Sequence, residues 1–391
     1  MCKEEIYINM NISFLVSEYL IFVCGIHWYK LQKEYENKYN EKFMKDFEKS
    51  KGYLQKMEGY LQKRLDKNHF DIDAVCTLAS VRLTLRYAES DCGKLLEDFL
   101  DKFFNSLDDI QKSRLYTNIA FYEDNSPLCL KYLNIAHKLK SPFIETYRGL
   151  GEYHFSQYQD NDSPDNLSLG KKYYKIAKDM TESYEDTFSY AVCLYELKEY
   201  KQAKDIFTDL LRRYKNRMRL LLSIAYCEIF LGNKESAKRY LEQVKPDEDS
   251  NYSLNTDNIS ECDIFDAYYV MDEYGIFLKY LNDEDVYTYY SISDWDYYFY
   301  ALWINDEKGF FNKLVEENRK YFKDAVKEAK EDDDYESTQD REETVKAWEK
   351  DAYYFEEMIS RIKSGIKKPK IKLSLYPEYS CYLTDCVVHK F

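Results

Sequence analysis

Residues 200–211, YKQAKDIFTDLL, share a pattern with residues 233–244, NKESAKRYLEQV. In each stretch a single Ala is followed by larger apolar residues four and seven positions later. The two alanines, Ala203 and Ala237, are 34 residues apart. A fixed interval of this length indicates a structural repeat, in which each unit buries its apolar face against the next one.

Other small residues extend the pattern. Ala191 and Ala225 are also 34 residues apart, and Gly151 and Gly170 take the corresponding places in the preceding unit if the extra residues within 157–166 form a loop insertion. Two antiparallel helices that cross closely need a residue without bulk at the crossing point, with larger residues one turn away. The sequence therefore predicts pairs of helices that pack at these small residues.

On these residues the chain resembles the tetratricopeptide repeat (TPR) family, whose unit is a helix-turn-helix of about 34 residues. The resemblance is clearest over about residues 141–246. It implies an all-α fold: a right-handed α-solenoid of TPR-like helix pairs, with an N-terminal helical cap and a divergent helical C-terminal part.

The domain organisation follows from periodicity and composition. A polar, turn-rich stretch at 246–263 is the predicted boundary. An amphipathic helix is predicted to follow Thr338, its predicted N-cap residue, and to end at Gly365. The apolar run at 12–26 contains Glu18 and is predicted to be a buried first helix rather than a signal or membrane segment. The predicted parts are 1–66, a helical region; 67–246, the TPR-like repeats; 264–364, divergent helices; and 365–391, an extended or β-hairpin tail.

Composition restricts the partners and the compartment. The chain has 391 residues and a formal net charge of −15, which repels a phosphate backbone, so nucleic acid is not an expected partner. The 10 Cys are scattered without a CxxC motif, as is typical of reduced thiols in a cytoplasmic protein. We therefore expect a cytoplasmic protein whose partner is a protein or peptide, with no membrane association.

Sequence motifs for catalysis or cofactor binding are absent: the chain has no GxxxxGK[ST], HExxH or GxSxG. Cys381, Cys386 and His389 lack a fourth ligand and a regular spacing, so we expect no metal and no cofactor. The acidic residues 331–334 lack the ligand order of a calcium loop and are predicted to be a solvated loop.

A catalytic alternative rests on two Arg and His pairs. Five residues separate Arg148 from His154, and four separate Arg64 from His69. Both spacings resemble the Arg-to-His motif of HEPN ribonucleases, in which Arg would stabilise phosphate charge while His moves protons. Since His154 falls inside a repeat helix that packing already explains, a HEPN-type ribonuclease is the remote alternative.

The TPR resemblance also implies a binding surface, because the first helix of each pair lines the concave groove of the superhelix. Its ligand-facing positions correspond here to Arg114, Asn118, Phe121, Tyr122, Arg148, Glu152, Phe155, Tyr195 and Tyr226, together with Val192, Glu196, Leu222, Ile229 and Phe230. Charge-assisted hydrogen bonds from Arg114, Asn118 and Arg148 would hold a peptide carboxylate and its backbone. As exposed groove residues, these three are expected to contribute to binding and little to stability.

These features predict a non-catalytic TPR scaffold that recognises a protein or peptide in its groove. The negative charge favours an adaptor or a neutralising partner for a protein with a basic surface. The alternative is a peptide-gated regulator, since the chain resembles Rap-type quorum-sensing receptors in size and in joining an N-terminal helical region to TPR repeats.

Overall fold

The computed structural model describes residues 33–39, 44, 46–123, 126–215, 217–246, 257, 259–281, 295–332, 335 and 337–389. Within these ranges the regular structure is helical and contains no strand, which confirms the all-α prediction. The predicted first helix at 12–26 and residues 247–256 of the predicted boundary lie outside the described ranges. The chain divides into two compact units, one formed by residues up to Ile206 with Leu375 onward, the other by Phe207–Ser374.

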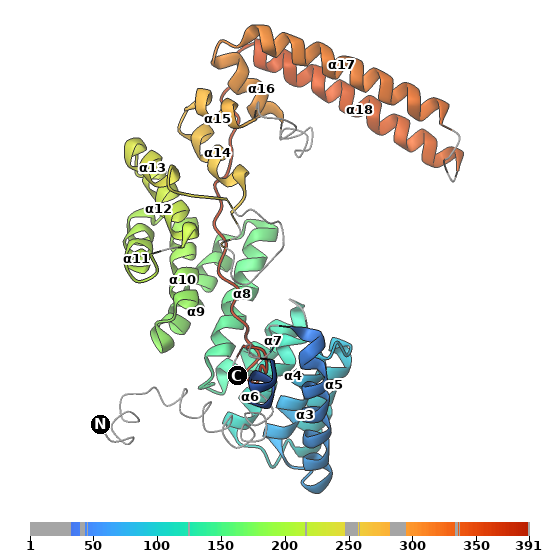
Figure 1. The fold of residues 1–391 in the computed structure, drawn as a ribbon, viewed down its shortest axis with the longest axis vertical. Helices are drawn as coiled ribbons and strands as arrows, with labels where there is room; N and C mark the ends of the chain where they lie inside the picture. The colour runs from blue at the N-terminus through green and yellow to red at the C-terminus, as the bar shows by residue number, and fades with distance from the viewer. Residues whose placement is uncertain are drawn as a thin grey trace. The chain divides into compact units, whose positions relative to one another are not determined.

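The first unit is an array of helices in which neighbours along the chain pack against each other (Figure 1). Its helices are α3 (Phe47–Lys67), α4 (Ile72–Thr84), α5 (Glu89–Phe103), α6 (Asp109–Phe121), α7 (Pro127–Lys138), α8 (Ile144–Asn161), α9 (Pro164–Thr181) and α10 (Tyr184–Glu196). Alternate helices also touch, α4 with α6 and α6 with α8. Sequential packing of this kind is that of an α-solenoid.

The small residues of the repeat lie where helices meet. A Cβ added at Gly170 would be 3.5 Å from the backbone oxygen of Gly151 and 3.5 Å from the backbone nitrogen of Phe155, so the backbones of α8 and α9 approach closely there. Ala191 and Ala203 are fully buried, and so are the alanines 34 residues later. The predicted role of the small positions is therefore confirmed.

The loop insertion predicted within 157–166 is wrong. Helices α8 and α9 each have 18 residues, whereas α10 has 13, so the extra residues lengthen two helices. Only Asp162 and Ser163 separate them. The oxygen of Ser163 accepts a hydrogen bond from the amide of Asn166, and Pro164 occupies the first turn, where its missing N–H costs nothing.

The second unit continues with helix pairs and ends in two long helices. Helix α11 (Tyr200–Arg213) contains the boundary between the units. The further helices are α12 (Met218–Phe230), α13 (Lys234–Leu241), α14 (Glu261–Val270), α15 (Tyr274–Leu281), α16 (Trp295–Ile304), α17 (Lys308–Glu331) and α18 (Thr338–Lys363). Phe355, Ile359 and Ile362 of α18 are buried, as the amphipathic pattern predicts, but the N-cap is Ser337 and not Thr338.

After α18 the chain runs without helix or strand over residues 366–383. In the second unit Lys368 fixes this run to the end of α14, since its ammonium group donates to the carbonyls of Tyr269 (2.7 Å) and Val270 (3.1 Å). A cation at these carbonyls is favoured because the last carbonyls of a helix have no partner within it. In the part of the chain that the structure describes, no helix combines the length and the apolar character needed to cross a bilayer.

Candidate functional site

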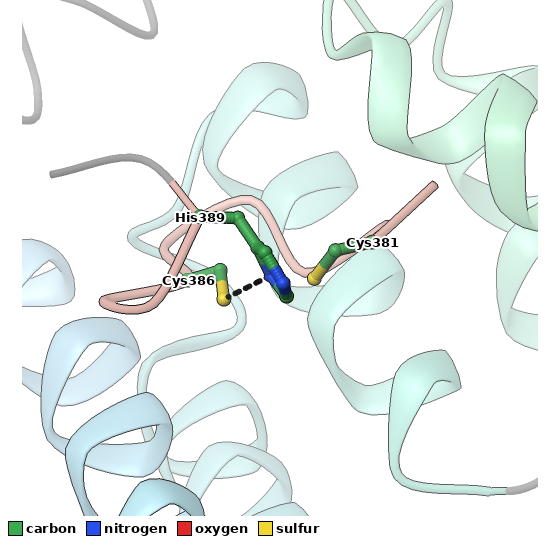
Figure 2. A group of neighbouring side chains, drawn as sticks. All are labelled: Cys381, Cys386 and His389. Carbon is green, nitrogen blue, oxygen red and sulfur yellow. Dashed lines mark hydrogen bonds between the residues drawn. The ribbon is translucent and has the colours of Figure 1, made fainter. Parts of the chain in front are cut away.

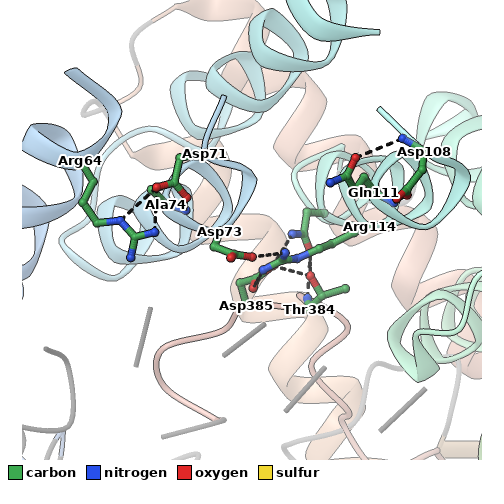
Figure 3. Close-up of polar contacts among 10 residues, drawn as sticks. Arg64, Asp71, Asp73, Ala74, Asp108, Gln111, Arg114, Thr384 and Asp385 are labelled. Carbon is green, nitrogen blue, oxygen red and sulfur yellow. Dashed lines mark hydrogen bonds and ion pairs between the residues drawn. The ribbon is translucent and has the colours of Figure 1, made fainter. Parts of the chain in front are cut away.

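In the first unit, residues 375–389, here called the C-terminal segment, lie across helices α4, α6, α8 and α10. The side chains of these helices that contact the segment form what we call the tail-binding face. N-terminal caps fix where α4 and α6, two of the helices that form this face, begin. Asp108 begins α6 with a capping box to Gln111, and Asp71 caps α4 through the amide of Ala74 while pairing with Arg64. Figure 3 shows both caps.

Arg114 of α6 is the centre of the contact (Figure 3). Its Nε donates to Oδ2 of Asp385 at 3.0 Å and its Nη2 donates to Oδ1 of the same carboxylate. Its Nη1 donates to Oδ1 of Asp73 in α4 at 2.6 Å. The guanidinium group thus joins two helices of the array to the C-terminal segment, and its bidentate pairing is the geometry that Arg favours with carboxylates.

Asn118, one turn after Arg114, contacts Asp385 as well and also the preceding residue of the segment, Thr384. Its Nδ2 donates to Oδ2 of Asp385 at 2.9 Å, and its Oδ1 accepts from the backbone amide of Thr384 at 2.8 Å. The hydroxyl of Thr384 lies 2.8 Å from Asn118 Oδ1 and 2.6 Å from Asp385 Oδ2. Backbone and side chain of the segment are therefore both recognised.

The network is buried and contains two carboxylates, Asp73 and Asp385, for one guanidinium group. Arg114 and Asp385 expose 2% and 4% of their side chains, and Asn118 is fully buried. Burial raises the pKa of Asp73, and the neighbouring Arg114 opposes that rise. One cation is shared by two carboxylates, so removing it would leave two buried acids without a counter-charge.

Contacts along the segment follow the helices in reverse order. The amide of Leu375 donates to Glu196 of α10 at 3.1 Å, and Glu378 accepts from the hydroxyl of Tyr184 at 3.3 Å. At the other end, the amide of Val387 donates to Ser80 of α4 at 3.0 Å. An extended peptide that crosses the first helices of successive repeats would make contacts in this order.

Tyr382 lies between these ends and packs against Phe121 and Gly149. Its ring meets that of Phe121 at 5.0 Å between centroids in an edge-on arrangement. A Cβ added at Gly149 of α8 would lie 2.8 Å from the ring of Tyr382, closer than atoms can approach without displacement. Gly149 therefore makes room for the ring.

Arg148, the third predicted carboxylate ligand, does not reach the segment through any of its described hydrogen bonds. Its Nε and Nη2 donate to the carboxylate of Asp186 in α10 at 2.8 and 2.7 Å. The expectation that Arg114, Asn118 and Arg148 are exposed groove residues is wrong for the first two, because the chain's own C-terminal segment covers them, and Arg148 exposes only 18% of its side chain.

The other predicted ligand positions have separate environments. Tyr122, Phe155 and Tyr195 are buried, while Glu152 is half-buried and its burial raises its pKa to about 7. Tyr226 belongs to the second unit, where its hydroxyl donates to the carbonyl of Asp263 at 2.7 Å. As ligand contacts, these positions stay predictions.

The residues of the ribonuclease alternative have structural partners. His154 Nδ1 lies 2.9 Å from Oδ1 of Asn166, its ring stacks on Tyr173, and burial lowers its pKa. Arg64 pairs with Asp71, and His69 is exposed. Packing thus accounts for His154, and pairing with the helix cap Asp71 accounts for Arg64.

Two thiols and an imidazole meet at the end of the segment (Figure 2). The ligand atoms of Cys381, Cys386 and His389 all lie within 4.8 Å of one another. Hydrogen bonds with Cys381 and with His389 lower the pKa of Cys386 well below its ordinary value. The lowered pKa favours the thiolate form of Cys386 beside the imidazole of His389.

The helix pairs and the extended contact surface define a helical-repeat protein of the α-solenoid class. Residues 188–217, which cover most of α10 and all of α11, match the family model of the tetratricopeptide repeat. The chain therefore contains a tetratricopeptide repeat, in agreement with the resemblance carried by Ala191 and Ala203. No curated protein matches the chain. A tetratricopeptide repeat within a helical array is in general a protein-interaction scaffold.

Sequence reasoning placed Arg114, Asn118 and Phe121 on a shared surface but missed their partners. Asp385 is 271 residues from Arg114, and no local pattern relates the two. The alternating pattern of residues 370–388 predicted a hairpin or an extended segment lying on the helices, without indicating which helices it contacts. Which helices it covers depends on tertiary packing.

Proposed function

We propose that this protein is a non-catalytic interaction scaffold that recognises an extended segment of another protein, as an adaptor or as a neutralising or regulatory partner. The observation that carries the proposal is the set of hydrogen bonds by which Arg114 and Asn118 hold Asp385 and Thr384. These contacts combine charge-assisted hydrogen bonds to a carboxylate with a hydrogen bond from a peptide N–H, which is how extended peptides are recognised.

The C-terminal segment indicates the chemistry of the partner. Tyr382 fills the space above Gly149, Thr384 supplies a hydroxyl and an amide, and Asp385 supplies the carboxylate. We expect the partner segment to carry an aromatic residue, then Thr or Ser two positions later, then Asp. The net charge of −15 further favours a basic surface around that segment.

The proposal is tested with a labelled peptide of residues 375–389. In the wild-type chain, the chain's own segment competes at an effective concentration of roughly millimolar, so the peptide should bind weakly. A chain carrying Asp385→Ala has a weakened segment and should bind the peptide more tightly. The exposed Asp98 of α5 supplies the matched control, Asp98→Ala, which should behave as wild type.

Changes in the peptide test the recognised residues. A peptide with Asp385→Ala should bind the Asp385→Ala chain about tenfold or more weakly, because a hydrogen bond to a charged group contributes about 1.5–3 kcal/mol. A peptide with Val388→Ala should bind nearly as tightly as the unchanged peptide, since Val388 is exposed. Equal affinity of all peptides, or binding to none of the chains, would contradict the proposal.

Occupation of the face by the chain's own segment also favours a second candidate, a regulator gated by a soluble peptide, as in the Rap-type alternative. A gating peptide would displace the C-terminal segment. For a gated regulator, addition of the gating peptide should make residues 375–389 of the wild-type chain accessible to protease. For an adaptor, the Asp385→Ala chain should capture the partner protein from the native host, and the Asp98→Ala chain should capture less of it.

A further inference from the structure

The end of the C-terminal segment gathers three metal-binding side chains. Cys386 Sγ lies 3.1 Å from His389 Nδ1, and all three ligand atoms of Cys381, Cys386 and His389 are within 4.8 Å of one another. Figure 2 shows the three side chains pointing toward one another. We propose that these residues form a binding site for a thiophilic divalent metal ion of the zinc type.

The distances fit such an ion with small adjustments. Zn–S distances of about 2.3 Å and Zn–N distances of about 2.0 Å in a tetrahedron separate sulfur from nitrogen by about 3.5 Å and sulfur from sulfur by about 3.8 Å. Cys386 Sγ and His389 Nδ1 lie 3.1 Å apart, and no two of the three ligand atoms are more than 4.8 Å apart. Rotation of exposed His389 and half-buried Cys381 would bring the three to tetrahedral separations.

The donor set selects the class of metal. Two thiols and one imidazole suit Zn²⁺ and related soft or borderline ions, and they do not suit Mg²⁺ or Ca²⁺, which take oxygen ligands. Cys386 is buried beside Leu383, whereas His389 is exposed. Because His389 is exposed, a water molecule or an external thiol can reach the ion and complete the coordination.

The position of the site in the segment gives the metal a structural effect. Cys381 precedes Thr384 and Asp385, and Cys386 and His389 follow them. A metal joining these three side chains closes a loop around the two residues that Arg114 and Asn118 hold. Closing that loop restricts the free segment more than the docked one, so the ion should strengthen docking.

Cobalt titration tests the site in the reduced, metal-free full-length chain under anaerobic conditions. Co²⁺ bound by thiolates in a tetrahedral site gives sulfur-to-metal charge-transfer absorption and strong visible bands. We expect one equivalent to bind per chain and to be displaced by Zn²⁺. Cys386→Ser, Cys381→Ser and His389→Ala should each lower the affinity by at least about 100-fold, since even an outer-shell change costs 10–100-fold.

Two variants keep the result interpretable. His389→Ala changes an exposed side chain and should fold normally, and Cys262→Ser removes a half-buried thiol of α14 outside the cluster and should leave the cobalt spectrum unchanged. The proposal would be overturned if the cobalt spectrum of the wild-type chain matched that of the double variant Cys381→Ser, His389→Ala. It would also be overturned if the reduced chain bound no cobalt and its oxidised form carried a Cys381–Cys386 disulfide. Peptide binding and metal binding are measured separately, so failure of one proposal leaves the other standing.

Discussion

Arg114 and Asp385 are 271 residues apart in the sequence and form a bidentate ion pair in which both side chains are almost entirely buried. The pair fastens the C-terminal segment to α6, and Asp73 of α4 shares the same cation. A buried ion pair does not by itself add much stability, but leaving one partner alone is costly. Changes at this pair therefore report directly on docking of the segment.

Asp385→Ala should lower the free energy of unfolding by about 1.5–3 kcal/mol, because it removes the charge-assisted hydrogen bonds from Arg114 and Asn118, while Asp73 still pairs with the guanidinium group. Urea unfolding measures the change, and hydrogen exchange at the amides of Thr384 and Val387 shows whether the segment has been released. Asp98→Ala, at an exposed position of α5, should stay within about 0.5 kcal/mol of wild type. A loss below about 1 kcal/mol for Asp385→Ala would mean that the segment is not docked as described.

Gly149→Ala should destabilise docking although Ala favours helix. The new Cβ would lie 2.8 Å from the ring of Tyr382, so the ring must move. The matched control is Gly59→Ala in α3, where nothing lies within 4 Å and a gain of about 0.5–1 kcal/mol is expected. Limited proteolysis of residues 375–389 is the measurement, and Tyr382→Leu should reduce the effect of Gly149→Ala. If residues 375–389 were equally protected from protease in Gly149→Ala and Gly59→Ala, this packing would be contradicted.

Glu152 should make stability depend on pH near neutrality. Burial raises its pKa from 4.5 to about 7, so the fold favours the protonated carboxyl group. Its contribution is fully present below about pH 4.5 and is lost as the pH rises through about 7. The effect is isolated by measuring the free energy of unfolding between about pH 4.5 and 7 and subtracting the value for Glu152→Gln from that for the wild type. A difference that does not vary with pH would show that the carboxyl group is solvated.

Arg148→Ala should destabilise the junction of α8 and α10 by about 3–5 kcal/mol at pH 7, because the carboxylate of Asp186 is fully buried. Burial raises the pKa of Asp186, but hydrogen bonds from Arg148, Thr181 and Ser183 outweigh burial and hold the pKa below 3.8. The cost should therefore shrink as the pH falls below about 4, where protonation removes the unpaired charge. Arg212→Ala, at an exposed position of α11, is the control. A cost independent of pH would point to lost packing alone.

The repeat architecture was predictable because its determinants are local and periodic. Small residues 34 positions apart mark where helices cross, and the close approach at Gly151 and Gly170 bears this out. The helix register also placed Arg114 and Asn118 on one surface, since four residues make about one helical turn. The wrong loop insertion near Asp162 shows that spacing alone cannot distinguish a longer loop from two longer helices.

The occupant of that surface was decided only by the tertiary structure. No period or local propensity links Asp385 to Arg114, and their contact depends on the path by which residues 375–389 cross α10, α8, α6 and α4 in turn. The cluster of Cys381, Cys386 and His389 likewise arises from a turn that brings irregularly spaced side chains together. Sequence thus determined which helices form and which faces they present, because helix geometry repeats every few residues. Burial of the C-terminal segment on those faces determined which of their polar residues are free, because that depends on contacts between distant parts of the chain.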